Sequence, residues 1–264
     1  MIRPRKRFGQ HFLHDRDVVD RIIDSIDFNS NDTPVEIGPG LGALTLPLLA
    51  RAHQLHVIEI DLDLAERLEQ SVGQTGKLVI HRSDVLKFNF STISKEKLII
   101  IGNVPYNIST PLLFHLLDQL SCISRMVLML QKEVADRICA APGSRDYGRL
   151  SIMVQSVCSV EQLFNVEAGS FTPVPKVESS VITISPLIEQ EIKIHDRNLF
   201  NILVRTAFSK RRKTIRNALK TLLQDKELLA AGISPSSRPE QVPVEAYAKL
   251  ANIIYDDSRV RGEE

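Results

Sequence analysis

The feature that most constrains this chain is the alternation of short apolar runs with segments of helical periodicity in its first half. Apolar runs that read as strands occupy residues 34–40, 54–61, 77–84, 97–103 and 125–131. Segments with helical spacing follow at residues 43–51, 62–72, 109–120 and 132–141. Strands that alternate with helices in this way predict a parallel sheet covered on both faces. The pattern therefore predicts an α/β fold.

The second half of the chain changes this pattern twice. Two strands are expected at 159–169 and 177–187, joined by the proline-rich stretch FTPVPK without a crossover helix, which predicts an antiparallel pair at one sheet edge. Helical periodicity then dominates, and residues 196–225 have the apolar spacing of one long helix. We expect a sheet domain over residues 1–189 and a small all-helical domain over residues 190–264.

Charge is distributed unevenly although the formal net charge of the 264 residues is only +1. Residues 1–14 contain basic side chains and no acid, and residues 205–220 contain seven basic residues and no acid. Basic segments in a nearly neutral chain favour docking of a polyanion. The odd number of cysteines, none close to another, argues against a disulfide framework. With no signal-peptide pattern and no long apolar stretch, we expect a cytoplasmic protein.

The first predicted strand ends in the glycine-rich sequence EIGPGLG. Gly38 and Gly40 let the loop backbone approach a ligand without a Cβ in the way. Glu59 ends the next strand, on the order of 20 residues later, where a carboxylate can accept hydrogen bonds from both ribose hydroxyls. Asp84 ends the third strand and can hold an adenine amine, with the Val85 N–H on a ring nitrogen. Three successive strand ends therefore predict a nucleoside site.

The spacing of the glycines indicates which nucleoside this is. A dinucleotide site prefers G-x-G-x-x-G, which seats a pyrophosphate on a helix N-terminus, whereas this loop reads G-x-G-x-G. Glu36 lies two residues before the loop and suits a positively charged ligand. S-adenosylmethionine carries an ammonium and a sulfonium and no phosphate, so the loop favours it over NAD.

The fourth strand ends in Asn-Val-Pro-Tyr, residues 103–106. A planar exocyclic amine is a poor nucleophile, and two acceptors on its hydrogens favour the pyramidal, reactive form. The side-chain oxygen of Asn103 and the carbonyl of Pro105 are the expected acceptors, and Tyr106 offers a ring face for the base. Such groups act mainly in the transition state. The alternative is a simple turn in which Asn103 bonds its own loop.

Six blocks together resemble the KsgA/Dim family of small-subunit ribosomal RNA adenine dimethyltransferases: EIGPGLGALT, GNVPYNISTPLLFHLL, MLQKEVADRI, YGRLS, FTPVPKVESSV and RRKTIRNAL. They run in order over nearly the whole chain. The resemblance implies a class I (Rossmann-like) methyltransferase fold with a mostly parallel seven-stranded sheet, and S-adenosyl-L-methionine as methyl donor. The implied reaction dimethylates the N6 amines of two adjacent adenosines near the 3′ end of 16S rRNA, within a 30S-like particle, during ribosome biogenesis. We expect a monomer without a metal.

The resemblance also implies roles for single residues. It places Gly38, Glu59, Asp84 and Asn103 around the donor, with His11 and Leu13 closing over it. The family often has asparagine at the position of His11, so only the backbone contact of Leu13 carries over directly. Phe171 is implied as a second stacking face for the flipped base. Candidate RNA contacts in the basic segment, which we expect to belong to an RNA-binding domain, are Arg205, Lys210, Arg211, Arg212, Lys213 and Arg216.

Three alternatives remain open from the sequence. A related enzyme that dimethylates one adenine of large-subunit rRNA, and confers macrolide resistance, would share the donor loop. A ribosome-assembly or transcription factor could keep this fold and bind RNA with dispensable catalysis. An NAD oxidoreductase is disfavoured by the glycine spacing.

Overall fold

The computed structural model describes all residues except 1–8, 29–31, 74–75, 188–191, 211–212 and 263–264, and it leaves the side chains of 258–262 undescribed. The chain forms two compact units, one of residues 1–135 and 160–186, the other of residues 136–159 and 187–264. The units part close to the boundary expected at residue 189. The second unit also takes in residues 136–159, which the sequence grouped with the sheet domain.

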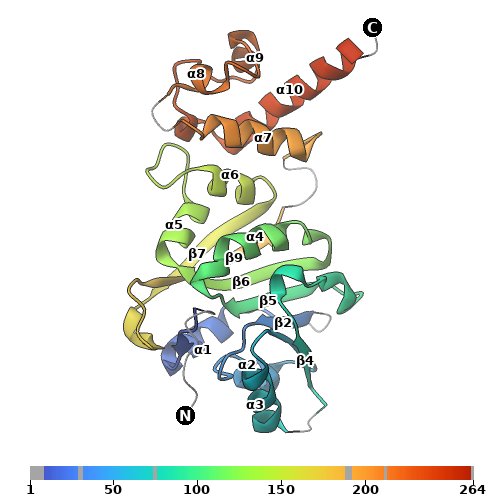
Figure 1. Cartoon of the computed structure of the whole chain (residues 1–264), viewed down its shortest axis with the longest axis vertical. Coiled ribbons are helices and arrows are strands. Elements are labelled where there is room, and N and C mark those ends of the chain that lie inside the picture. The colour runs from blue at the N-terminus through green and yellow to red at the C-terminus, as the bar shows by residue number, and fades with distance from the viewer. Residues whose placement is uncertain (1–8, 29–31, 74–75, 188–191, 211–212, 263–264) are drawn as a thin grey trace. The chain divides into compact units, whose positions relative to one another are not determined.

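Seven strands of the chain form one sheet in the order β4-β3-β2-β5-β6-β9-β7 (Figure 1). Their bounds are β2 (Thr33–Ile37), β3 (Leu55–Glu59), β4 (Leu78–Arg82), β5 (Leu98–Asn103), β6 (Ile123–Gln131), β7 (Cys158–Val166) and β9 (Ser179–Pro186). The neighbours from β4 to β6 pair in parallel, and β9 runs antiparallel to β6. The predicted mostly parallel, seven-stranded sheet is confirmed, with the last two strands at one edge.

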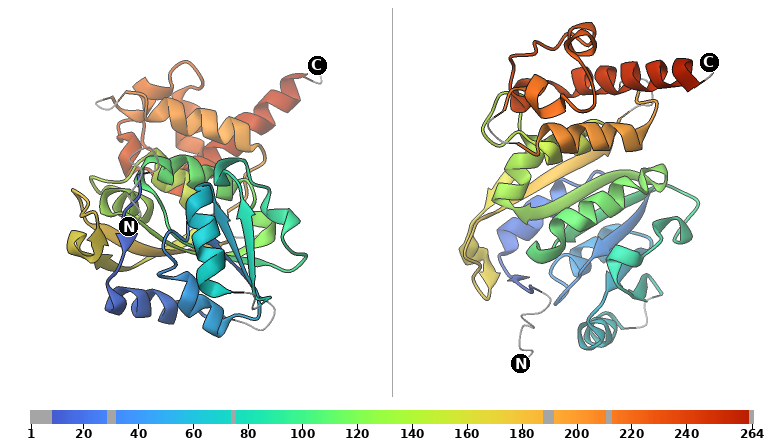
Figure 2. Two further views of the ribbon diagram at one scale, coloured as in Figure 1. Left: turned by 60° about the horizontal axis from the view of Figure 1, so that its bottom comes forward. Right: turned by 45° about the horizontal axis from the view of Figure 1, so that its top comes forward.

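Helices cover both faces of this sheet. They are α1 (Arg16–Asp24), α2 (Thr45–Arg51), α3 (Leu62–Val72) and α4 (Ser109–Leu117), while α5 (Lys132–Cys139) spans the boundary between the units. Ile99 and Ile101 of β5 share one apolar cluster with side chains of α1, α2 and α3. Leu98 and Ile100, which alternate with them, are equally buried, and α4 lies on the opposite side of the sheet from α1 (Figure 2). A strand covered on both faces is apolar at every position.

Gly102 allows the close approach of β5 to β2 that positions the site. A Cβ on Gly102 would lie 2.9 Å from the backbone oxygen of Ile37, its partner in the ladder. A side chain at this position would push the two strands apart. Because Gly38 follows Ile37 and Asn103 follows Gly102, the pairing brings the glycine loop and the Asn-Val-Pro-Tyr segment to the same end of the sheet.

A second, two-stranded sheet holds the N-terminal segment in place. β1 (Phe12–Leu13) pairs antiparallel with β8 (Phe171–Thr172). The His14 N–H also donates to the Ser170 carbonyl at 3.0 Å. The sequence did not predict this pair, because two-residue strands carry no periodicity.

The second unit is built from helices. Its first part contains α6 (Arg149–Gln155), and its part beyond residue 187 contains α7 (Arg197–Ala207), α8 (Ile215–Leu219), α9 (Asp225–Ala230) and α10 (Val244–Gly262). Phe200, Ile215 and Tyr247 belong to one buried cluster that joins α7, α8 and α10. Gly232 has a φ of +79° just after α9, as expected for a residue that ends a helix. The predicted all-helical C-terminal part is confirmed.

The prediction of one long helix over residues 196–225 is wrong. α7 ends at Ala207 and α8 begins at Ile215, after Thr214 in an extended conformation. Adjacent cations repel at helical spacing, and Lys210 and Lys213 lie in the connection between the two helices. In the described part of the chain, no helix has both the length and the apolar character needed to cross a bilayer.

Candidate active site

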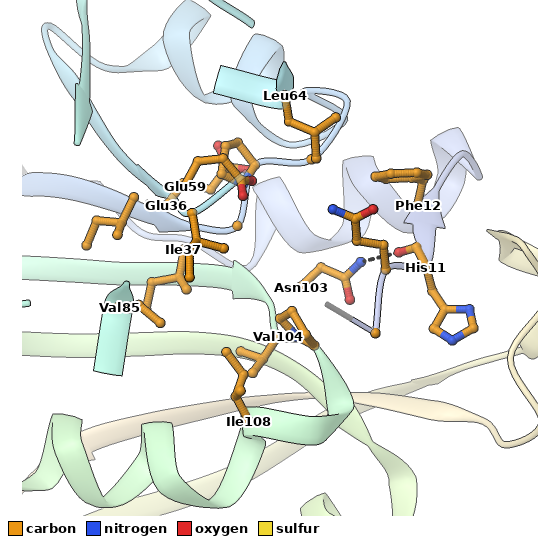
Figure 3. A pocket seen from close by; sticks show the side chains of 18 of the residues that line it. His11, Phe12, Glu36, Ile37, Glu59, Leu64, Val85, Asn103, Val104 and Ile108 are labelled. Carbon is orange, nitrogen blue, oxygen red and sulfur yellow. Dashed lines mark hydrogen bonds between the residues drawn. The ribbon is translucent and has the colours of Figure 1, made fainter. Parts of the chain in front are cut away.

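The carboxyl ends of the central strands open onto one pocket in the first unit (Figure 3). Ligands of open α/β sheets bind at this edge. The pocket collects every residue predicted to hold the donor, namely His11, Leu13, Gly38, Gly40, Glu59, Asp84, Val85 and Asn103. Segments widely separated in sequence therefore converge on one pocket, and the role of these residues in holding the donor stays a prediction.

The glycine loop forms an open cradle on one side of the pocket. Gly38 has a φ of +65°, and a Cβ built on it would meet no atom within 4 Å. Gly40 has a φ of +57°, and its Cβ would lie 3.2 Å from the ring of Phe12. Glycine is needed at both positions for the backbone conformation. The space beside Gly38 fits a ligand such as S-adenosylmethionine that lies directly on the backbone.

Glu59 lies at the end of β3 with a carboxyl group that is fixed and nearly buried. It is 6% exposed, and its Oε1 accepts a hydrogen bond from the Asp61 N–H at 2.8 Å. Burial raises the pKa of Glu59, and the backbone N–H groups of Asp61, Gly40 and Ile60 act in the opposite direction. This geometry fits a carboxylate that receives ribose hydroxyls.

Asp84 and Val85 follow β4 and line the pocket at the third strand end. Asp84 Oδ1 accepts from the Leu86 N–H at 3.0 Å and caps the 3-10 helix over Val85–Lys87. The first N–H groups of a helix have no partner within it, so the Val85 N–H at this position suits an adenine ring nitrogen. The predicted pair therefore lies together at the edge of the pocket.

Glu36 is a buried carboxyl beside the donor site. It is 2% exposed, and the Thr45 hydroxyl donates to its Oε2 at 2.6 Å. Burial raises the pKa of Glu36 to about 8, and the neighbouring Glu59 adds to this increase. Figure 3 shows Glu36 and Glu59 close together at one end of the pocket.

The charges that line the pocket suit a cation. Carboxyl groups come from Glu36, Glu59 and Asp84, and no lysine or arginine is present among the described lining residues. A phosphate would be repelled by the ionised carboxylates and would find no cation among the described lining residues. The side chains present therefore fit S-adenosylmethionine and disfavour a dinucleotide.

The N-terminal segment forms the opposite wall of the pocket through residues 9–13. The Gln10 side chain donates to Asp61 Oδ2 at 3.2 Å, and Phe12 packs on Gly40. These two contacts and the β1–β8 pair fasten the segment across the strand ends. The sequence did not single out Gln10 or Asp61 because each is an ordinary surface residue type.

Asn103 is oriented by this wall. Its Nδ2 donates to the backbone carbonyl of His11 at 3.1 Å, and its Oδ1 is directed away from that bond (Figure 3). The partner lies 92 residues earlier in the chain, so Asn103 does not simply bond its own loop. The arrangement presents an acceptor oxygen to the pocket.

Pro105 and Tyr106 follow Asn103 but differ in how they fit the expected roles. The Pro105 carbonyl accepts from the Ile108 N–H at 3.1 Å and from the Ser109 hydroxyl at 3.3 Å. Two partners use both lone pairs of a carbonyl oxygen, which conflicts with the role predicted for it. Tyr106 lines the pocket, and its hydroxyl is hydrogen-bonded to Ser179 Oγ at 2.8 Å.

Phe171 does not lie where the resemblance implied. Its side chain is 1% exposed and packs in the core beside α1, with Leu13 as its partner in the β1–β8 pair. It is absent from the described pocket lining. In this conformation Phe171 therefore supports the N-terminal segment and offers no face to a base.

The predicted RNA contacts that the structure describes are surface residues of the second unit. Arg211 and Arg212 lie outside the described residues. Arg205, Lys210 and Lys213 are exposed. Arg216 is exposed too, but it forms a two-point ion pair with Asp225, with Nε–Oδ1 at 2.8 Å and Nη2–Oδ2 at 2.5 Å. Its charge is therefore partly committed within the unit.

Comparison with known proteins identifies the family. The model of the family described as ribosomal RNA adenine dimethylase matches residues 1–256. A ribosomal RNA small subunit methyltransferase A from Nitrosococcus oceani is 50% identical over 250 residues, which cover 94% of this chain and 95% of that protein. The chain belongs to the ribosomal RNA adenine dimethylase family. Membership confirms the predicted enzyme class and, with it, S-adenosylmethionine as the methyl donor.

Further relatives of this family agree in sequence and in structure. The enzyme of the same name from Pseudomonas aeruginosa is 49% identical over 252 residues, covering 95% of this chain and 94% of its own. A dimethyladenosine transferase from Plasmodium falciparum has a TM-score of 0.79 at 27% identity, covering 94% of this chain and 98% of its own. The 23S rRNA methyltransferase ErmE has a TM-score of 0.74 at 25% identity, with coverage of 92% and 99%. The predicted class I methyltransferase fold is thus confirmed.

Proposed function

We propose that this enzyme dimethylates the N6 amines of two adjacent adenosines near the 3′ end of small-subunit (16S) rRNA. The observation that carries the proposal is the convergence of Asn103 and Tyr106 with Gly38 and Glu59 on a single pocket. The relatives that are about half identical over nearly the whole chain are named for the small subunit. The substrate is proposed to be the rRNA within a 30S-like particle, and the enzyme to act as a cytoplasmic monomer.

The donor is held by the residues of the strand ends. Glu59 receives the ribose hydroxyls, Asp84 receives the adenine amine, and the Val85 N–H bonds a ring nitrogen. The glycine loop lies against the amino-acid portion, with Glu36 near its positive charge. S-adenosylmethionine, when bound, supplies a methyl group on a positively charged sulfur.

Asn103 holds the target amine in the reactive geometry. Its Oδ1 accepts one amine hydrogen, which draws the nitrogen toward the pyramidal form and points its lone pair at the methyl group. Because the His11 carbonyl already fixes the amide of Asn103, little reorganisation accompanies the reaction. Preorganised groups of this kind lower the barrier because they favour the transition state over the ground state.

The second acceptor is assigned to the carbonyl of Val104. Val104 lines the pocket next to Asn103, whereas the Pro105 carbonyl forms the first hydrogen bond of the 3-10 helix over Tyr106–Ile108. A base flipped out of the RNA would stack on the ring of Tyr106. The Tyr106 hydroxyl, bonded to Ser179, keeps that ring at a fixed angle.

Methyl-group mapping tests the proposal. Purified enzyme is incubated with labelled S-adenosylmethionine and small-subunit particles that lack the modification, and the labelled nucleotides are located in the rRNA. We expect N6,N6-dimethyladenosine at two adjacent positions near the 3′ end. Label in large-subunit rRNA alone would point to the activity named for ErmE instead, and unlabelled RNA would point to a factor that only binds.

A further inference from the structure

The ring of Tyr106 is already covered by another ring in the structure. The imidazole of His11 stacks on it with the ring centroids 5.5 Å apart and the planes inclined by 27°. Both residues line the donor pocket. His11 thus contacts the residue that our proposed function assigns to the target base.

No base fits between these two rings. Stacked aromatic pairs in contact have centroids about 4.5–7 Å apart. A base inserted between them would need two layers of about 3.5 Å each, so roughly 7 Å from ring to ring at the least. The observed 5.5 Å is shorter than that.

His11 contacts both residues that the proposed function assigns to the target base. The backbone carbonyl of His11 accepts from Asn103 Nδ2 at 3.1 Å while its imidazole lies on Tyr106. One residue therefore contacts both groups assigned to the base, the acceptor and the stacking face. A base that stacks on the face of Tyr106 covered by His11 must displace the imidazole.

The imidazole can leave without dismantling the site. One hydrogen bond is described for its side chain, in which Nδ1 donates to the Pro173 carbonyl at 2.7 Å. The bond to Asn103 comes from the backbone of His11, and the β1–β8 pair begins at the next residue. A rotation about the side-chain bonds would uncover Tyr106 and leave the wall of the pocket in place.

We propose that the His11 imidazole occupies the stacking face of Tyr106 in the free enzyme and that the target adenine displaces it. His11 then competes with the target base for the ring of Tyr106, so the imidazole lowers the affinity of the free enzyme for that base. This inference rests on the proposed role of Tyr106.

Removal of the ring tests the proposal. We expect His11→Ala to raise the single-turnover rate at limiting particle concentration and saturating donor by about 2–10-fold, as the loss of one aromatic pair predicts. His11→Asn, which also lacks a stacking ring, should behave in the same way. His11→Phe keeps a ring on Tyr106 and should stay at or below the wild-type rate. His14→Ala, on an exposed residue outside the described pocket lining, is the matched control.

The same substitutions made in the Tyr106→Ala variant distinguish a failure of this inference from a failure of the proposed function. In Tyr106→Ala the gain from His11→Ala should vanish, because no ring remains to be uncovered. A slower His11→Ala enzyme rescued by His11→Phe would show that His11 stacks on the bound base and would overturn the proposal. Equal rates for all variants, or a gain that persists without Tyr106, would also overturn it. If Tyr106→Ala alone leaves the wild-type rate unchanged, the stacking role in the proposed function fails instead.

Calorimetry with S-adenosylmethionine shows whether the variants keep an intact pocket. We expect similar donor affinity for His11→Ala and wild type, since the bond from His11 to Asn103 is made by the backbone. A loss of donor affinity in both His11→Ala and His11→Asn, with no gain in rate at saturating donor, would place the imidazole in donor binding and overturn the proposal.

Discussion

Asn103 owes its orientation to a backbone carbonyl 92 residues earlier in the chain. A side-chain amide fixed on one side by an acceptor must turn its oxygen to the other side. The residue can therefore act as an acceptor only while the N-terminal segment lies across the pocket. In the proposed function, donor binding beneath this segment and holding of the target amine are thus linked through the side chain of Asn103.

Asn103→Ala removes the proposed acceptor for the target amine. We expect the single-turnover rate of methyl transfer to fall by about 10²-fold or more, by analogy with loss of one oxyanion-hole donor. The measurement uses saturating S-adenosylmethionine, so that any loss of donor affinity does not affect the rate. An Asn103→Ala enzyme as fast as wild type would reduce the motif to a turn.

The raised pKa of Glu36 predicts that binding of the donor is coupled to the release of a proton. A pKa of about 8 means that the free enzyme holds Glu36 mainly protonated at pH 7. A cationic donor favours the ionised carboxylate, so binding of S-adenosylmethionine should release a proton. We expect the affinity to rise as pH increases from 6 to 8 and then to level off.

Calorimetry in buffers of different ionisation enthalpy checks this coupling. Wild type should show proton release near pH 7, whereas Glu36→Gln, which keeps an oxygen for the Thr45 hydroxyl, should show less. Equal proton release in both proteins would assign the proton to another group.

The sequence was more informative about which residues line the pocket than about residues that act through packing. Glu59 and Asp84 were expected at one site because strand ends and acid side chains are visible in the sequence, and both line the pocket. The contacts of Phe171 and Pro105 do not fit the roles predicted for them, because these contacts depend on partners distant in sequence or on a turn. The core beside Leu13 covers Phe171, and a helical turn engages the Pro105 carbonyl. No local pattern reports either contact.

At the scale of elements, caps and apolar spacing predicted some helices closely and left others out. α3 runs over Leu62–Val72 as predicted, between the capping Asp61 and a Gly73 with a φ of +67°. α1 was missed although Asp15 caps it and its buried face has helical spacing. The prediction of one long helix across the basic segment was wrong because the apolar periodicity continues through the residues that connect α7 and α8.

This basic connection between α7 and α8 gives a prediction for RNA binding. Replacing Arg211, Arg212 and Lys213 with glutamine should weaken binding to the small-subunit particle and flatten its log–log salt dependence by up to about three phosphate contacts. Donor affinity, measured by calorimetry, should stay at the wild-type value.

Arg216→Gln offers a matched control for the triple variant. Arg216 is paired with Asp225. Arg216→Gln should therefore change the slope of the log–log salt dependence by less than the loss of one phosphate contact would. A triple variant with the wild-type slope would place the RNA surface elsewhere.

At the scale of the whole molecule, a histidine pair makes the stability depend on pH. His56 is 7% exposed, and its Nδ1 lies 3.0 Å from His81 Nε2. Burial lowers the pKa of His56 to about 4, and the charge of His81 adds to this effect. The unfolded chain therefore binds a proton at His56 below about pH 6.5 that the folded chain rejects. This contribution to stability is lost as pH falls from about 6.5 toward 4.

His56→Gln isolates that contribution from carboxyl groups such as Glu36, whose raised pKa acts in the opposite direction. We expect the free energy of unfolding of wild type to fall relative to the variant by about 1–3 kcal/mol between pH 7 and pH 4. Denaturant unfolding of both proteins at the two pH values measures this. A difference that does not change with pH would exclude His56 as the cause.

The strand order β6-β9-β7 has a consequence for the synthesis of the chain. The ribosome releases β7 before β9, yet β9 lies between β6 and β7. Until Pro186 has emerged, the growing chain exposes an apolar strand edge on β6, the kind of surface that aggregates or that chaperones cover. β9 also brings Ser179, the partner of Tyr106. Arrival of this one strand during translation thus covers the exposed edge of β6 and supplies the hydrogen-bond partner of the Tyr106 hydroxyl.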